Sequence, residues 1–132
     1  MNPTQPEPAT IESLADSPRL PVVFVGHGSP MNAIEDNAYR RSWQDLGSKF
    51  GVTWPRPQLI LCVSAHWLTQ GWWLTAMDAP RTIHDFGGFP PELFAQTYPA
   101  PGQPAAAREL SQRLRQPGSG NALGLDVDAW GL

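Results

Sequence analysis

Residues 21–25 (PVVFV) constrain the fold most, because this apolar run breaks abruptly into the turn sequence of residues 26–30 (GHGSP). A short, β-branched run that ends in glycine is typical of a buried strand that feeds a tight turn. Glycine on both sides of His27 leaves the imidazole uncrowded and permits backbone angles that other residues avoid. We therefore expect a strand end that presents His27 into a crevice.

A second apolar run, residues 58–64 (QLILCVS), is also predicted to be a buried strand, and His66 follows its end. The segment between the two runs predicts an amphipathic helix capped by Asn37, with apolar residues at helical spacing: Tyr39, Trp43, Leu46 and Phe50. Strand, helix and strand with continuous apolar strands favour a parallel pair. Because ligands bind beyond the carboxyl ends of parallel strands, we expect His27 and His66 to face one crevice.

The rest of the chain predicts more elements of the same kind. Residues 72–77 and 123–127 are further strand candidates, the first of them at a sheet edge. One helix is expected over residues 90–98 and another over residues 104–115, the second with three apolar residues pointing inward: Ala107, Leu110 and Leu114.

The beginning of the chain differs from the remainder in composition. Residues 1–20 contain four prolines and are expected to form a disordered lead-in, with one helical turn near residues 11–15. The predicted domain then covers residues 21–132. Its fold class is α/β, with a mostly parallel sheet flanked by helices.

Composition excludes several classes of protein. A chain of 132 residues with 41% hydrophobic and 16% charged residues suits one globular domain. The net charge of -3 provides no basic surface, so nucleic acid is not an expected partner. No apolar stretch approaches the roughly 20 residues of a membrane span, and the N-terminal residues show no signal pattern. Cys62, the single cysteine, is expected to be buried, and its isolation suits a reducing, cytoplasmic location.

Six tryptophans are a large aromatic load for a small core. Either they line a pocket, or they pack against something that this chain lacks. Trp67 follows His66 directly and is placed to form the wall of a flat aromatic pocket.

The three histidines, His27, His66 and His84, all fall in turn or loop signals. A single such histidine is simply explained by a ring bonded to a backbone carbonyl, whereas two at matching strand ends point to a metal or catalytic pair. Imidazole suits zinc, iron, copper and nickel; a catalytic zinc has three protein ligands, and an iron(II) oxygenase uses two histidines and a carboxylate. The possible third ligands in the chain lack diagnostic spacing: Glu35, His84, Asp85, Asp126 and Asp128.

His84 and Asp85 lie in a predicted loop that also contains Gly87 and Gly88. A histidine beside a carboxylate in a loop can bind a substrate oxyanion or transfer a proton. The alternative is that Asp85 merely caps the turn while His84 is exposed. Two other motifs are incomplete: Ser29 lacks the Gly-x-Ser-x-Gly context of a nucleophile, and Met31 interrupts a dinucleotide-binding pattern.

Four ordered motifs identify a family resemblance. They are residues 26–31 (GHGSPM), 64–67 (SAHW), 82–90 (TIHDFGGFP) and 98–102 (YPAPG). Together they resemble the 4,5-DOPA-extradiol-dioxygenase-like proteins of the class III extradiol ring-cleavage dioxygenase (LigB-like) superfamily, over residues 21–132.

The resemblance implies an α/β domain around a mononuclear non-haem metal, iron(II) or alternatively zinc(II). His27 and His66 would be metal ligands, His84 would bind substrate and act as an acid/base catalyst, and Asp85 and Trp67 would contribute to the substrate site. The implied reaction opens the ring of a catecholic, DOPA-like diol next to its two hydroxyl groups and incorporates both atoms of dioxygen.

The end of the chain departs from the family pattern. Family members usually continue after residues 130–132 (WGL) with an Asp-His-Gly segment that carries another active-site histidine, and their third protein ligand lies later still. The resemblance therefore implies an N-terminal half, truncated by an interrupted gene or an incomplete sequence, which is inactive by itself. Two other functions stay open: a zinc-dependent hydrolase using the same histidines, and a non-catalytic module that binds aromatic ligands through its tryptophans.

Overall fold

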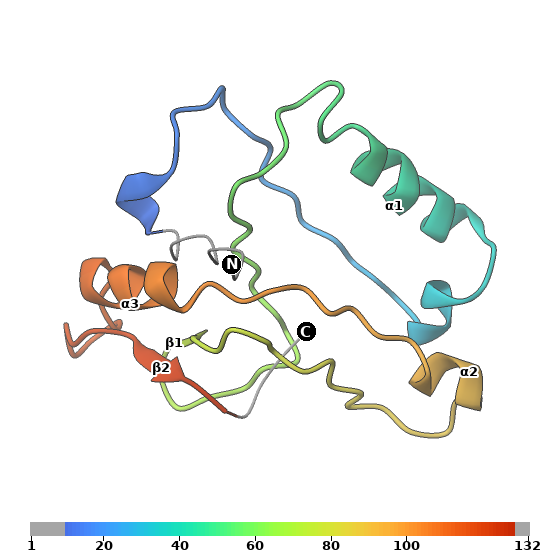
Figure 1. Ribbon diagram of the computed structural model, residues 1–132. Helices are drawn as coiled ribbons and strands as arrows, with labels where there is room; N and C mark the ends of the chain where they lie inside the picture. Colours follow the sequence, from blue (N-terminus) through green and yellow to red (C-terminus); the bar gives the residue numbers. More distant parts are fainter. Residues whose placement is uncertain (1–9, 129–132) are drawn as a thin grey trace, which may run out of the picture. The chain divides into compact units, whose positions relative to one another are not determined.

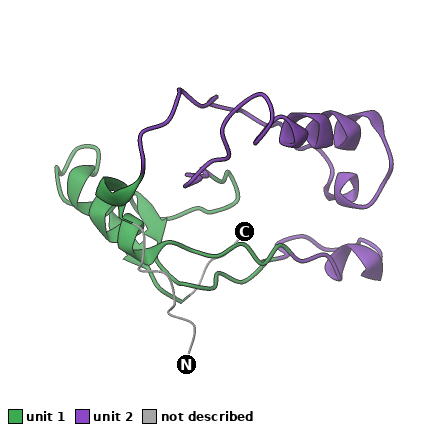
Figure 2. Cartoon of the chain, turned by 45° about the horizontal axis from the view of Figure 1, so that its top comes forward, with its two compact units in different colours: residues 1–14, 64–83, 98–132 green, residues 15–63, 84–97 purple. Residues whose placement is uncertain are grey.

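The computed structural model describes residues 10–128, which form two compact units (Figure 2). Among these residues, unit 1 contains 10–14, 64–83 and 98–128, and unit 2 contains 15–63 and 84–97. Each unit therefore combines segments that are far apart in the sequence.

Unit 1 is built on a parallel pair of short strands, β1 (Trp73–Thr75) and β2 (Gly124–Asp126), with Leu74 opposite Leu125. Helix α3 (Pro104–Arg113) packs against both strands (Figure 1). Proline at its first position suits a helix start, because the missing N–H would have had no helical partner. The buried residues of this unit lie on α3 or beside the strands: Ala76, Ala106, Ala107, Ser111 and Leu123.

A short 3-10 helix, η1 (Ile11–Ser13), is attached to α3 by polar contacts. The Ile11 N–H donates to Glu109 Oε2 at 2.6 Å, and Arg113 pairs with Glu12 and Glu109 at 2.5 Å each. The helical turn predicted near residues 11–15 is thus confirmed. The disordered lead-in predicted for residues 1–20 falls partly on residues 1–9, outside the described residues.

Unit 2 contains the 3-10 helix η2 (Pro30–Ala33) and the helices α1 (Ala38–Ser48) and α2 (Pro91–Phe94), with η2 in contact with both helices. The predicted cap of α1 is confirmed, because Asn37 Oδ1 accepts from the Arg40 N–H at 3.0 Å. Helix α2 ends before the predicted limit of residue 98. Proline at position 99 disfavours helical backbone at the residue before it, which opposes a longer helix.

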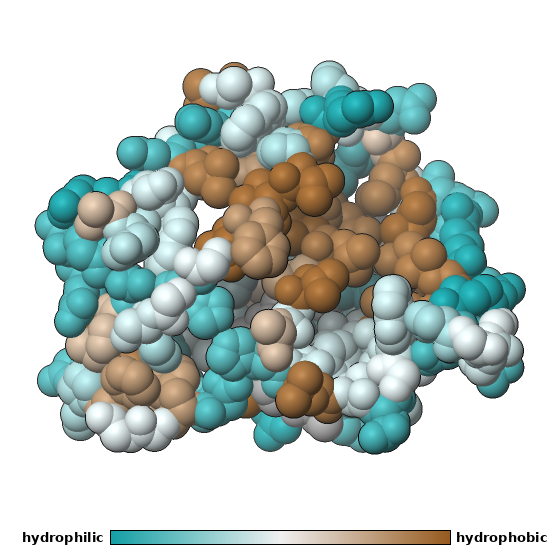
Figure 3. Space-filling view, turned by 180° about the vertical axis from the view of Figure 1, so that it is seen from behind, coloured by the Kyte–Doolittle hydropathy of each residue, from teal (hydrophilic) through white to brown (hydrophobic). Residues whose placement is uncertain are grey.

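The strands predicted over residues 21–25 and 58–64 are wrong, since neither segment belongs to a strand. In both segments several apolar side chains lie in solvent: Val22 is 102% exposed, Phe24 98% and Val63 92%. Hydrophobic side chains are accordingly gathered at the molecular surface in Figure 3. A strand exists only through ladder hydrogen bonds to a neighbour, and within residues 10–128 these runs have no ladder partner.

The predicted α/β class is confirmed, and its parallel sheet comes from the two later candidates, residues 72–77 and 123–127. Two side-chain predictions are wrong. Cys62 is exposed, because the run around it is not covered. Leu114 is 41% exposed, since α3 ends at Arg113 and the extended backbone of Leu114 leaves the inward face.

No helix in the part of the chain that the structure describes is long and apolar enough to cross a membrane.

Candidate functional site

His27 lies in the turn before η2 and its side chain is exposed. Its Nδ1 is 2.9 Å from the backbone oxygen of Gly28, and since a carbonyl oxygen only accepts, Nδ1 carries the proton. In the neutral ring the lone pair is therefore on Nε2. Gly28 has a φ of +64°, a left-handed conformation that glycine adopts without strain.

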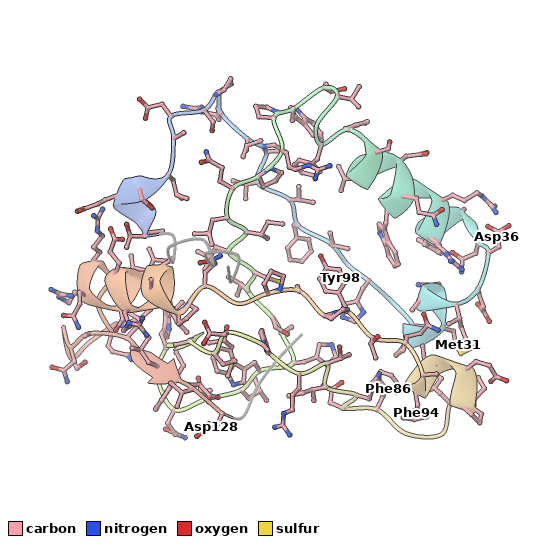
Figure 4. The ribbon with its side chains drawn as sticks, in the orientation of Figure 1. Met31, Asp36, Phe86, Phe94, Tyr98 and Asp128 are labelled. Carbon is pink, nitrogen blue, oxygen red and sulfur yellow. The ribbon has the colours of Figure 1, made fainter. Side chains whose placement is uncertain are left out.

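His84 shows the opposite arrangement. Its Nε2–H donates to the backbone oxygen of Gln96 at 2.8 Å, so the lone pair of the neutral ring is on Nδ1. The ring is half-buried, with centroid distances of 5.7 Å to Phe86 and 5.9 Å to Phe94. Figure 4 shows Phe86 beside α2, which ends at Phe94.

The aromatic residues Phe86, Phe89 and Phe94 form a group that we call the phenylalanine cluster. Ring centroids lie 5.4 Å apart for Phe86 and Phe89 and 5.2 Å apart for Phe86 and Phe94, distances typical of favourable aromatic pairs. Gly88, with a φ of +77°, permits the turn between Phe86 and Phe89. This cluster was not predicted from the sequence, although the Phe-Gly-Gly-Phe spacing of residues 86–89 was a usable signal.

The other predicted site residues are His66 and Trp67 of unit 1 and Asp85 of unit 2. His66 is exposed in a turn of unit 1, where its backbone N–H donates to Ser64 Oγ at 3.2 Å, and Trp67 beside it is half-buried. Asp85 is exposed next to His84.

Each unit has an open surface groove. The groove in unit 2, of about 450 Å³, lies between residues 23–26 and the α1 residues Trp43 and Leu46. The groove in unit 1, of about 410 Å³, lies beside Trp73 and Gln116. Trp67 lines neither, so its role as the wall of an aromatic pocket stays a prediction.

His27 and His84 belong to unit 2, whereas His66 belongs to unit 1. The expected juxtaposition of His27 and His66 rested on two strands that the structure lacks, and it stays a prediction. Within residues 10–128, no three histidine, cysteine, aspartate or glutamate side chains gather as a group able to hold a metal ion.

Several known proteins are similar in sequence to this chain. A protein of Escherichia coli (strain K12) named 4,5-DOPA dioxygenase extradiol is 52% identical over 125 residues, which are 95% of this chain and 43% of that protein. A Beta vulgaris protein of the same name is 36% identical over 117 residues, with coverage of 81% and 41%. The chain is a homologue of these proteins.

The resemblance inferred from the four motifs is therefore confirmed. This homologue of 4,5-DOPA dioxygenase extradiol spans less than half the length of the curated relatives that it matches. A further relative, from Hapsidospora irregularis and named dioxygenase tasH, is 30% identical over 110 residues. No protein-family model and no solved structure matches the chain.

Proposed function

We propose that this chain forms part of an extradiol dioxygenase that cleaves the ring of a catecholic, DOPA-like substrate with dioxygen. The observation that carries the proposal is the 52% identity to the Escherichia coli 4,5-DOPA dioxygenase extradiol over 95% of the chain. Identity at this level over 125 residues supports a shared reaction class. The substrate within the aromatic diols stays open.

His27 and His66 are the proposed metal ligands. His27 fits this role, because a metal-binding histidine usually donates its other ring N–H to a carbonyl or carboxylate, as His27 Nδ1 does to Gly28. Two imidazoles suit non-haem iron(II), with zinc(II) as the alternative. Iron(II), when bound, would supply the redox chemistry that allows dioxygen to react with the diol. The third protein ligand is proposed to lie beyond Leu132, in the length that the relatives have in addition.

His84 is the proposed acid/base residue of this chain. Its Nε2–H is held by Gln96, which leaves Nδ1 as the nitrogen that can accept a proton from a substrate hydroxyl. Phe86 and Phe94 pack against the ring and limit the orientations open to it. Asp85 and Trp67 are proposed to contact the substrate. We also propose a cytoplasmic location, because a chain with a single cysteine cannot form an internal disulfide and therefore suits a reducing compartment.

We also propose that ring cleavage requires the full length of the relatives, so that the 132-residue chain binds metal weakly and is inactive. The test combines iron(II) titration and oxygen uptake with DOPA and with catechol, with the Escherichia coli relative as the positive control. We expect His27→Ala and His66→Ala each to weaken iron binding and oxygen uptake to stay at background.

Three results would count against these proposals. Stoichiometric iron and cleavage of a catechol by the 132-residue chain would contradict its inactivity. Iron affinity that is unchanged in both alanine variants would contradict the ligand assignment. Hydrolysis by the zinc-loaded chain, with no oxygen uptake after exchange to iron, would favour the hydrolase alternative.

A further inference from the structure

The turn that presents His27 is connected to helix α1 by two asparagine side chains. Asn37 makes the first connection through both ends of its amide. Its Oδ1 accepts from the Arg40 N–H at 3.0 Å and caps α1, while its Nδ2 donates to Asn32 Oδ1 at 2.8 Å. One side chain therefore caps the helix and contacts the preceding 3-10 helix.

Asn32 continues the connection to the histidine. Its Nδ2 donates to the backbone oxygen of His27 at 2.8 Å, so hydrogen bonds run without interruption from α1 through Asn37 and Asn32 to His27. Asn32 and Asn37 are both only partly exposed. The two amides are hydrogen-bonded to each other, and each also bonds to a backbone group.

The backbone between His27 and Asn32 is shaped to fit this arrangement. The Asn32 N–H donates to the Ser29 oxygen at 3.0 Å, and the Met31 N–H donates to Ser29 Oγ at 3.2 Å, which forms the start of η2. A Cβ at Gly28 would lie 3.3 Å from Asn32 Nδ2, which is tighter than ordinary contact. The Gly28 oxygen accepts from His27 Nδ1, so the two peptide groups that follow His27 both take part in hydrogen bonds.

We propose that Asn32 and Asn37 are positioning residues for His27. They hold its turn so that Nδ1–H stays on the Gly28 oxygen and Nε2 is presented as the metal-binding nitrogen. This inference rests on the proposed role of His27 as a ligand and deepens it. The competing explanation is that Asn37 serves only as a helix cap, and a single substitution separates the two roles.

The decisive variant is Asn37→Asp, because a carboxylate still accepts from the Arg40 N–H but has no N–H to donate to Asn32. Asn32→Ala removes the middle of the connection. Gln44→Glu, at an exposed position of α1, is the matched control, since it makes the same change from amide to carboxylate.

The first measurement uses metal-free protein and requires no activity. Long-range 1H–15N spectra report which ring nitrogen carries the proton, and the three histidines can be assigned by replacing each with alanine. We expect an Nδ1–H signal for His27 in the unsubstituted chain and in Gln44→Glu. In Asn37→Asp and Asn32→Ala we expect a mixture of the two tautomers, with the helix content by circular dichroism unchanged in Asn37→Asp.

The second measurement is zinc affinity, with zinc alone as the probe. Loss of a residue that orients a metal ligand typically lowers affinity about 10–100-fold. We expect that loss in Asn37→Asp and in Asn32→Ala, and not in Gln44→Glu.

The inference is overturned if Asn37→Asp leaves the His27 tautomer and the zinc affinity as they were. Should Asn32→Ala unfold, Asn37→Asp still decides the outcome. Zinc affinity that is unchanged in His27→Ala would instead overturn the ligand role of His27. The tautomer measurement would still decide whether Asn32 and Asn37 position the ring.

Discussion

The two histidines of unit 2 present opposite nitrogens because each is hydrogen-bonded to a different backbone carbonyl. His27 donates from Nδ1 to Gly28 and His84 donates from Nε2 to Gln96. A neutral imidazole has one donor and one acceptor nitrogen, so the carbonyl that holds one nitrogen determines the chemistry of the other. This difference supports a ligand role for His27 and an acid/base role for His84 in the proposed function.

The phenylalanine cluster is expected to hold His84 in place. We predict that Phe86→Leu lowers the free energy of unfolding of the chain by about 0.5–1.5 kcal/mol, the usual contribution of one aromatic pair beyond its buried area. Phe86 is the ring that contacts His84, Phe89 and Phe94 together. Urea unfolding measures the change, and the His84 ring proton shifts should move in the same variant. Unmoved His84 signals would show that Phe86 does not pack against the ring.

Ser111 is a buried polar residue of α3 that the apolar pattern did not indicate. It is 2% exposed and its Oγ–H donates to the Leu123 oxygen at 2.5 Å, which ties the helix to the segment before β2. We predict that Ser111→Ala destabilises the chain by about 1–3 kcal/mol, because it removes the partner of a buried carbonyl.

Ser48→Ala is the control for Ser111→Ala, since Ser48 is exposed and should change stability by less than about 0.5 kcal/mol. Both are measured by urea denaturation. Equal midpoints for the two variants would contradict the assigned role of Ser111.

At the scale of elements, the β1–β2 pair depends on a glycine under an aromatic ring. Gly124 lies opposite Trp73, and a Cβ at this position would come within 2.4 Å of a Trp73 ring carbon. Both the register and the ring position therefore require glycine. Strand β2 begins at this residue, so the constraint acts at the start of the pairing.

We predict that Gly124→Ala destabilises the chain by about 1–3 kcal/mol, the usual range for forced overpacking. Gly47→Ala is the matched control: Gly47 lies in the last turn of α1 with open space around it, so the same change should not destabilise and should stabilise by at most about 0.5–1 kcal/mol. Thermal unfolding measures both changes, and tryptophan fluorescence should shift only for Gly124→Ala. A stabilising Gly124→Ala would contradict the observed pairing.

At the scale of the whole molecule, the dominant feature is exposed apolar surface. Val22, Phe24 and Val63 are each more than nine-tenths exposed, at 102%, 98% and 92%. Extended apolar backbone without a ladder partner is prone to association, because both its side chains and its peptide groups can pair with another chain.

We predict that the double variant Val22→Ser/Phe24→Ser reduces concentration-dependent association in sedimentation velocity and lowers binding of a hydrophobic dye. Val52→Ser is the control, because Val52 is also highly exposed, at 84%, but lies outside residues 21–25. Association that is the same in both variants would show that residues 21–25 do not drive self-association.

The sequence by itself determined the α/β class, the Asn37 cap, the helices α1 and α3, and the motifs that the comparison with known dioxygenases confirmed. These depend on local signals, such as capping side chains, proline positions and helical periodicity, which act over a few residues. Only the tertiary structure decided which apolar runs become strands, which ring nitrogen of His27 and His84 carries the proton, and that Phe86 and Phe94 pack against the His84 ring. A strand needs a distant partner and a tautomer needs a particular carbonyl, and the sequence pattern of one segment specifies neither.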